Sequence, residues 1–332
     1  GWKQALKNNW FGIVFIAVCL FFLMSSQLGV LESGYDEYYY VGKMVNLQGA
    51  DRMFMEDYST GALIRDPEFD PVRFLNTYEL TYTWMGTLFG IALPFFARVS
   101  MSVVQNLLLF FLARETASWF VPKANAQFAA AGFLVFVLPD PFWQGVRNIL
   151  GAGLYSYDLW QFQLTPYFGS SVVRVSGFFA LFYFAQPLLE KIRWKHILCV
   201  GTAAAVLLSF STCILPVFGF FAIGILTARL LLDAWGFFRQ KETGKAAAAA
   251  AGALALTAGV IVLNRVIGLP QTELYDQFVQ AAADFHASNF REDVLLSYGF
   301  VILGLMMFFC RTKVQWGFVL LCVFLYFGLA NS

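Results

Sequence analysis

Two adjacent carboxylates, Asp36 and Glu37, follow an apolar run near residues 10–31 and stand ahead of three tyrosines, in the stretch GYDEYYYVGKM. A carboxylate just outside a lipid surface is partly desolvated, which raises its pKa toward the range that suits a general base. Such a group can take the proton from a hydroxyl nucleophile whose electrophile is anchored in the membrane. The pattern therefore raises the hypothesis of acid–base chemistry on a lipid-linked substrate, with Asp36 as the base.

The same residues also fit a structural role. After Gly34, residues recur at three and four residue intervals, which predicts a short helix lying at the membrane interface. Asp36 and Glu37 would occupy its first turn, where the helix dipole favours carboxylates. The tyrosines at 38–40 would then belong to an aromatic belt. The residue pattern leaves both interpretations open.

The composition indicates a membrane protein. Of the 332 residues, 59% are hydrophobic and 13% are charged, whereas an ordinary soluble domain is about 25% charged. The apolar residues come in continuous blocks near the roughly 20 residues that a helix needs to cross a bilayer. The expected fold class is therefore an all-α polytopic membrane protein. A net charge of +1 gives no reason to expect nucleic acid as a partner.

Nine apolar blocks are the expected spans of a single transmembrane domain covering residues 1–332. They lie near residues 10–31, 99–119, 126–139, 172–189, 196–213, 215–234, 246–265, 295–310 and 314–330. The segment 79–97 is ambiguous, because it is apolar enough to cross but contains Pro94 and two glycines. The first residue is Gly1 and the last block runs almost to Ser332, which suggests a processed or trimmed chain. The sequence leaves open whether further helices or a soluble C-terminal domain follow.

The basic residues set the expected orientation, because cytoplasmic loops are enriched in Lys and Arg near span ends. If 79–97 does not cross, the basic loops all fall on the side of the N-terminus. These residues are Lys3, Lys7, Arg114, Lys123, Lys191, Arg193, Lys195, Arg239, Lys241, Lys245, Arg311 and Lys313. We therefore expect an integral, multi-pass protein with a cytoplasmic N-terminus. The loops 32–98, 140–171 and 266–294 would lie outside.

In order and spacing, residues 10–190 resemble the GT-C superfamily of polytopic membrane glycosyltransferases. DEYYY follows the first span at the head of a long outer loop, as at the start of those enzymes. LFGIALPFFARVSMSVVQNLLLFFLARETASWF, residues 88–120, is similar to their segment in which an apolar LFG piece precedes an Arg and a long helix. Members of the superfamily use polyprenyl-phosphate-linked sugars; they include protein mannosyltransferases and aminoarabinose transferases.

The resemblance implies a fold and roles for particular residues. The fold would be a GT-C-like transmembrane helix bundle with interfacial helices in the first extracytoplasmic loop. Asp36 would act as catalytic base, Glu37 would help to shape the acceptor or metal site, and Tyr39 and Tyr40 would line the substrate pocket. The reaction would move a sugar, with inversion, from a polyprenyl-phosphate donor to a glycan, lipid or protein acceptor. The active site would lie on the extracytoplasmic face.

The departing phosphate needs cations more than a general acid, because phosphate is already a good leaving group. The candidates are Arg174, Arg147, Arg98, Lys43 and His286. Arg174 is favoured because small residues and an expected helix N-terminus lie beside it. Each candidate also has a structural interpretation, since an Arg at a span end can snorkel to the interface and a lone His often has no specific role.

Asp140 and Asp158 are the candidate metal ligands, because some members of the superfamily hold a divalent metal on acidic groups of the first two outer loops. Carboxylate oxygens suit Mg²⁺ or Mn²⁺. Neither residue lies in a DxD motif, and Asp140 stands between two prolines, where a turn is equally favoured. The sequence thus requires no cofactor and allows a divalent metal.

The main alternative function is a transporter or flippase for a lipid-linked or small solute. Such proteins usually place ionisable groups at mid-membrane in broken helices. Here Arg229 and Asp233 lie toward the cytoplasmic end of their block, and Arg265 lies at an outer end. A third interpretation is a non-catalytic scaffold. The expected partners of the transferase are a lipid-linked sugar, a hydroxyl acceptor and membrane lipids.

Overall fold

The computed structural model describes a helical protein. The described residues are 3, 6, 9–18, 21, 35–49, 56–57, 62–63, 75, 77–136, 167–212, 214–266 and 303–330. They are helical except for connecting turns and a two-residue antiparallel ladder, in which β1 (Glu56–Asp57) pairs with β2 (Ala62–Leu63). The all-helical class predicted from the continuous apolar blocks is confirmed.

Three helices in the described part of the chain are long and apolar enough to cross a membrane. They are the helical runs Leu93–Ala117, Gly169–Glu190 and Phe218–Arg239. Each has more than 20 residues, and a helix of that length spans the roughly 30 Å hydrocarbon core of a bilayer. These runs coincide with three of the expected blocks, which makes the chain compatible with a membrane protein.

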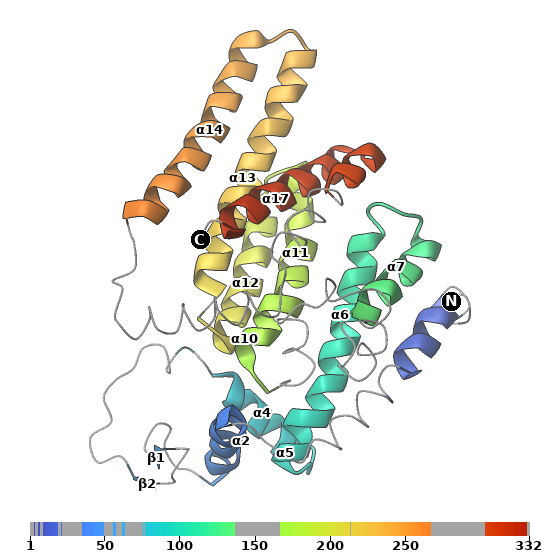
Figure 1. Ribbon diagram of the computed structural model, residues 1–332, viewed down its shortest axis with the longest axis vertical. Helices are drawn as coiled ribbons and strands as arrows, with labels where there is room; N and C mark the ends of the chain where they lie inside the picture. Colours follow the sequence, from blue (N-terminus) through green and yellow to red (C-terminus); the bar gives the residue numbers. More distant parts are fainter. Residues whose placement is uncertain are drawn as a thin grey trace, which may run out of the picture. The chain divides into compact units, whose positions relative to one another are not determined.

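The chain divides into two compact units. The first comprises Gly1–Val146, Tyr155–Tyr183 and Thr202–Ile214. Its described helices are residues 9–18, α2 (Tyr35–Leu47), α4 (Tyr78–Leu88), α5 (Leu93–Phe95), the π-helical η1 (Phe96–Ser100), α6 (Met101–Ala117), α7 (Lys123–Phe136), α10 (Gly169–Val172) and the π-helical η3 (Val173–Gly177), with parts of α11 (Phe178–Glu190) and α12 (Trp194–Phe210). Figure 1 shows α6 beside α7, and α2 beside α4 and α5.

The second unit comprises Arg147–Leu154, Phe184–Gly201 and Leu215–Ser332. Its described helices are the remaining parts of α11 and α12, then α13 (Ile214–Arg239), α14 (Thr243–Val266), residues 303–309 and α17 (Lys313–Ala330). A Cβ added at Gly224 of α13 would lie 2.7 Å from Leu321 Cδ1 of α17. The absence of a side chain at Gly224 therefore lets these two helices approach closely.

The ambiguous segment 79–97 forms two helices rather than one. Helix α4 ends at Leu88, and Gly90 adopts the left-handed conformation with φ of 66°. The amide of Ile91 bonds the carbonyl of Gly86 at 2.9 Å, and the amide of Gly90 bonds the carbonyl of Thr87 at 3.1 Å. This pattern is the Schellman motif that closes a helix at a glycine. The 11 residues of α4 span about 16 Å, which is shorter than the hydrocarbon core of a bilayer.

The next helical run begins six residues before the expected position. Leu93 opens α5, Pro94 lies in its first turn, and the helix continues through η1 into α6. Proline is tolerated in a first turn because its missing N–H would have no intrahelical acceptor there. The sequence interpretation placed this start at residue 99, after a segment that was ambiguous because it contains Pro94 and two glycines. In the structure, the proline lies in the first turn of the helix.

One charged pair within α13 is satisfied entirely by the protein. Arg229 Nε and Nη2 lie 3.0 and 2.9 Å from the two carboxylate oxygens of Asp233. Arg229 Nη1 donates to the carbonyl of Leu189 at 2.9 Å and to the carbonyl of Glu190. These carbonyls end α11 and have no partner within that helix. The pair therefore caps α11, which gives these ionisable residues a structural role.

The first unit contains a close backbone approach at Gly169, where α10 begins. A Cβ at this position would lie 2.1 Å from the carbonyl oxygen of Phe210 and 2.8 Å from a ring carbon of Tyr78. The nearest obstacle is backbone, which cannot move aside as the end of a flexible side chain can. Gly132 in α7 is the opposite case, since nothing lies within 4 Å of its added Cβ.

We expect Gly169→Ala to lower the free energy of unfolding by about 1–3 kcal/mol or more, because the added carbon forces α10 away from the end of α12. Gly132→Ala is the matched control, and it should raise stability by up to about 1 kcal/mol through helix propensity. Thermal unfolding of the purified protein in detergent measures both. Equal stability changes in the two variants would contradict the close approach.

Candidate functional site

Helix α2 carries the two carboxylates on which the sequence hypothesis depends. It begins at Tyr35, so Asp36 and Glu37 are its second and third residues and lie in the first turn, as predicted. The first amides of a helix have no intrahelical acceptor, and the dipole favours negative charge there. The side chains of Asp36 and Glu37 are outside the described part of the structure. The backbone alone therefore places these residues.

A buried ion pair joins α2 to α4. Lys43 Nζ lies 3.0 Å from Glu79 Oε1, and the two side chains are only 3% and 2% exposed. Lys43 was expected to contact phosphate, and the structure pairs it with Glu79. Seven residues separate Asp36 from Lys43, which is close to two helical turns. The register therefore places Asp36 on the same side of α2 as the cation that faces α4.

The carboxyl group of Glu79 is only partly satisfied. Its Oε2 atom is buried and has no hydrogen-bond partner among the described residues. Burial raises the pKa of Glu79 above its ordinary value, and the opposing effect of Lys43 is smaller. The Thr83 hydroxyl supports the helix contact, because its single proton is shared between two acceptors, the carbonyls of Met44 at 3.0 Å and Glu79 at 2.8 Å.

Glu79 is the residue that the sequence interpretation missed. It is the only charged residue in the apolar run ELTYTWMGTL, which belongs to the segment whose course was ambiguous. A carboxylate in such a run is almost never buried without a partner. Combined with the single Lys43 of the preceding helix, this signal could have predicted the pair.

Aromatic contacts connect Tyr78 and Tyr82, which lie near Glu79 on α4, to neighbouring segments. The Tyr78 ring stacks on Phe210 with centroids 5.6 Å apart, and its hydroxyl donates to the carbonyl of Tyr167 at 2.9 Å. Gln105 Nε2 donates to the hydroxyl of Tyr82 at 2.8 Å. Burial raises the pKa of both Tyr78 and Tyr82, so both phenols stay protonated at neutral pH. Tyr78, Tyr82 and Phe210 thus form a neutral aromatic wall near Glu79.

The tyrosines expected to line a substrate pocket lie on the same helix. Tyr39 and Tyr40 are half-buried and contact each other edge to face, with centroids 5.1 Å apart. The Tyr40 ring lies 5.1 Å from the ring of Phe168 and 6.4 Å from the ring of Tyr78. Tyr40 therefore belongs to the aromatic wall, and it connects α2 to the segment that leads into α10.

The structure describes some of the remaining predicted site residues. Arg98 is half-buried in η1, and Arg174 lies in η3, with its side chain outside the described part. Both arginines open the tripeptide Arg-Val-Ser, at 98–100 and 174–176, near the start of a long apolar helical run. The described residues do not include Arg147, His286, Asp140 or Asp158.

Metal ligation can be tested only within the described residues. No group of three or more His, Cys, Asp or Glu side chains gathers there in a way that could hold a metal. The candidate ligands Asp140 and Asp158 are outside those residues. The expectation that a divalent metal is allowed stays a prediction.

We expect Lys43→Met to lower the free energy of unfolding by about 3–5 kcal/mol at pH 7, because it leaves a buried carboxyl without its cation. The double variant Lys43→Met/Glu79→Leu should recover most of this loss, since apolar residues of similar volume replace both charges. Chemical unfolding in detergent measures the stability of Lys43→Met, of Glu79→Leu and of the double variant. The exposed Lys191→Met is the control. Additive losses from the two single changes would contradict a direct pair.

We also expect stability to depend on pH through Glu79. Its pKa is raised from the ordinary 4.5 in the folded state, so its stabilising contribution is fully present below 4.5 and is lost as the pH rises through the raised value. The melting temperature of Glu79→Gln should therefore fall less than that of the wild type between pH 4.5 and pH 7. The exposed Glu190→Gln is the control. Parallel curves for wild type and Glu79→Gln would exclude this linkage.

Comparison with known proteins assigns no family to this chain. No protein-family model, no curated protein and no solved structure matches it. The choice of function thus depends on the residues of α2 and α4 and on the helices around them.

Proposed function

We propose that this chain is a GT-C-type membrane glycosyltransferase. It moves a sugar from a polyprenyl-phosphate donor to the hydroxyl of a glycan, lipid or protein acceptor, with inversion, on the extracytoplasmic face. The observation that carries the proposal is the position of Asp36 and Glu37 in the first turn of α2, a helix fixed to α4 by the buried Lys43–Glu79 pair. A helix start keeps a carboxylate ionised, and a general base must be ionised and held in position to accept a proton.

The lengths of the helices support a site at the membrane boundary. Helices α2 and α4 have 13 and 11 residues and span about 20 and 16 Å. Both are shorter than the hydrocarbon core, whereas the helical run that follows, Leu93–Ala117, is long enough to cross it. Short helices ahead of a long apolar one are expected for an interfacial region, where a lipid-anchored sugar phosphate and a polar acceptor can meet.

The proposed reaction is a single displacement. Asp36 accepts the proton of the acceptor hydroxyl while its oxygen forms a bond to the anomeric carbon. The bond between that carbon and the phosphate oxygen breaks from the opposite face, which inverts the anomeric centre. The electron pair leaves with the polyprenyl phosphate. Since Tyr78 and Tyr82 stay protonated, they add no negative charge beside the leaving phosphate.

Two arginines are suited to the phosphate of the donor. Arg98 and Arg174 lie in the π-helical segments η1 and η3, and segments of this kind occur frequently at functional sites. Arginine binds phosphate oxygens through paired, charge-assisted hydrogen bonds. The repeated Arg-Val-Ser in both segments supports a shared role. Arg147 and His286 remain further candidates, and Asp140 and Asp158 remain candidates for holding Mg²⁺ or Mn²⁺.

We expect Asp36→Asn to lower the turnover of polyprenyl-phosphate sugar by about 10²–10⁴-fold, because the amide has the shape of the carboxylate but cannot accept the proton. Transfer of a radiolabelled sugar by the purified protein measures turnover. Binding of the donor and the melting temperature should stay close to the wild type. Glu190→Gln removes an exposed carboxylate elsewhere and should leave turnover unchanged.

The outcomes separate the candidate functions. Unchanged turnover in Asp36→Asn would remove Asp36 from the mechanism. Absence of transfer by the wild type, together with movement of a lipid-linked sugar across vesicles, would favour the transporter. A fold lost in Asp36→Asn would be recognised from its melting curve, and Asp36→Glu, which keeps the carboxylate, would then decide between a chemical and a structural role.

A further inference from the structure

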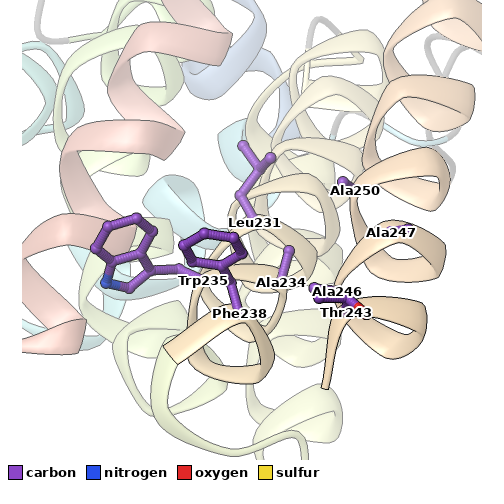
Figure 2. Close-up of a pocket in the computed structure, with 8 residues that line it drawn as sticks. All are labelled: Leu231, Ala234, Trp235, Phe238, Thr243, Ala246, Ala247 and Ala250. Atoms are coloured by element: carbon purple, nitrogen blue, oxygen red, sulfur yellow. The ribbon is translucent and has the colours of Figure 1, made fainter. Parts of the chain in front are cut away.

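A groove lies between α13 and α14 near the turn that joins them. Its volume is about 600 Å³, within the range of small-molecule sites. Figure 2 shows the lining side chains along the two helices. They are Leu231, Ala234, Trp235 and Phe238 of α13 and Thr243, Ala246, Ala247 and Ala250 of α14. Apart from the Thr243 hydroxyl and the indole N–H of Trp235, these side chains are apolar, so the groove favours an apolar occupant.

The sequence explains why the groove exists at this end of the hairpin. Large side chains of α13 face the alanine run of α14, and alanine is too short to fill the space between the helices. Two residues past Ala250 on α14, a Cβ added at Gly252 would lie 3.4 Å from Leu230 Cδ1, so the helices are close there. The groove therefore opens toward the turn and closes toward the middle of the helices.

Large aromatic surface is exposed at the groove. Trp235 is 62% exposed and Phe238 is 61% exposed. Both lie in the last turns of the run Phe218–Arg239, which is long and apolar enough to cross a membrane. Tryptophan near the end of such a helix is typical of the level of the lipid headgroups. At that level an apolar groove is next to the upper part of the acyl chains.

The turn beside the groove is basic. Residues 239–245 contain Arg239, Lys241 and Lys245 against the single acid Glu242. Lys245 Nζ lies 2.9 Å from Glu242 and 5.8 Å from the centroid of the Phe237 ring. Lys245 is thus held by Glu242 of the turn and by Phe237 of α13. The net positive charge that remains, on Arg239 and Lys241, complements an anionic headgroup.

We propose that this groove binds one acyl chain of an anionic phospholipid, whose phosphate contacts Arg239 and Lys241. The apolar lining accepts the chain, and the basic turn selects the headgroup. This site requires that the protein is embedded in a membrane, and it does not depend on the proposed glycosyl transfer. It lies in the second unit, whereas α2 and α4 belong to the first.

Quenching of tryptophan fluorescence by lipid tails tests the proposal. The full chain is reconstituted in phosphatidylcholine vesicles that contain increasing mole fractions of phosphatidylglycerol with brominated acyl chains. The fluorescence of Trp235 is obtained as the difference between the emission of the wild type and that of Trp235→Phe. Trp84, which is 64% exposed on α4, serves as the reference. Its quenching curve is obtained in the same way from Trp84→Phe. We expect Trp235 to be half-quenched at a mole fraction about tenfold lower than Trp84.

Two sets of variants separate the tail from the headgroup. Arg239→Gln/Lys241→Gln should move the Trp235 curve to that of Trp84, because only the headgroup contact is lost. Ala247→Leu fills the groove and should reduce the preferential quenching at all mole fractions. Ala248→Leu makes the same change at an exposed position of α14 that does not line the groove, and it should behave as the wild type.

Identical curves for Trp235 and Trp84 in the wild type would overturn the proposal. So would a preference that survives in Arg239→Gln/Lys241→Gln. If a second copy of the chain covers the groove, Trp235 stays unquenched and Ala247→Leu changes the oligomeric state in size-exclusion chromatography. That outcome would also overturn the lipid site. Circular dichroism of each variant distinguishes a lost site from a lost fold.

Discussion

The contact between Lys43 and Glu79 fixes the geometry of the candidate site. Removing a charge from water is costly, and a pair with 3% and 2% exposed side chains is tolerated only when both partners are held in place. Lys43 sits two helical turns after Asp36 on α2, and Glu79 is the second residue of α4. Any movement of α2 against α4 would separate the charges. The pair therefore fixes the height and rotation of the helix that opens with Asp36 and Glu37.

The aromatic wall transmits this constraint to distant parts of the first unit. The stacking of Tyr78 on Phe210 and the bond from Tyr78 to the carbonyl of Tyr167 join α4 to the end of α12 and to the start of α10. Gly169 allows the backbone of α10 to approach Phe210. Segments separated by more than 130 residues in the chain thus meet at Tyr78, the residue next to Glu79.

The positions of the long helices could be predicted because continuous apolar blocks are a strong signal. Their ends were less predictable. The run Leu93–Ala117 starts early since Pro94 initiates it, and α13 continues five residues past the expected end at 234 because Trp235 and Phe238 are compatible with a helix. The helix at Asp36 followed from the spacing after Gly34. Glu79 was missed because a tertiary contact with Lys43 decides its role, although a lone carboxylate in an apolar run was a sequence signal for such a pair.

Two charged pairs in this apolar chain show how structure separates a supporting role from a candidate functional one. Arg229 and Asp233 lie on one helix, bond through both carboxylate oxygens and cap the last carbonyls of α11. Every charge has a partner, which explains their presence without chemistry. Glu79 keeps one buried oxygen without a partner among the described residues, and its pKa is raised. Unsatisfied buried groups cost stability and therefore need an explanation. A site that binds and releases a polar ligand next to α2 would provide one.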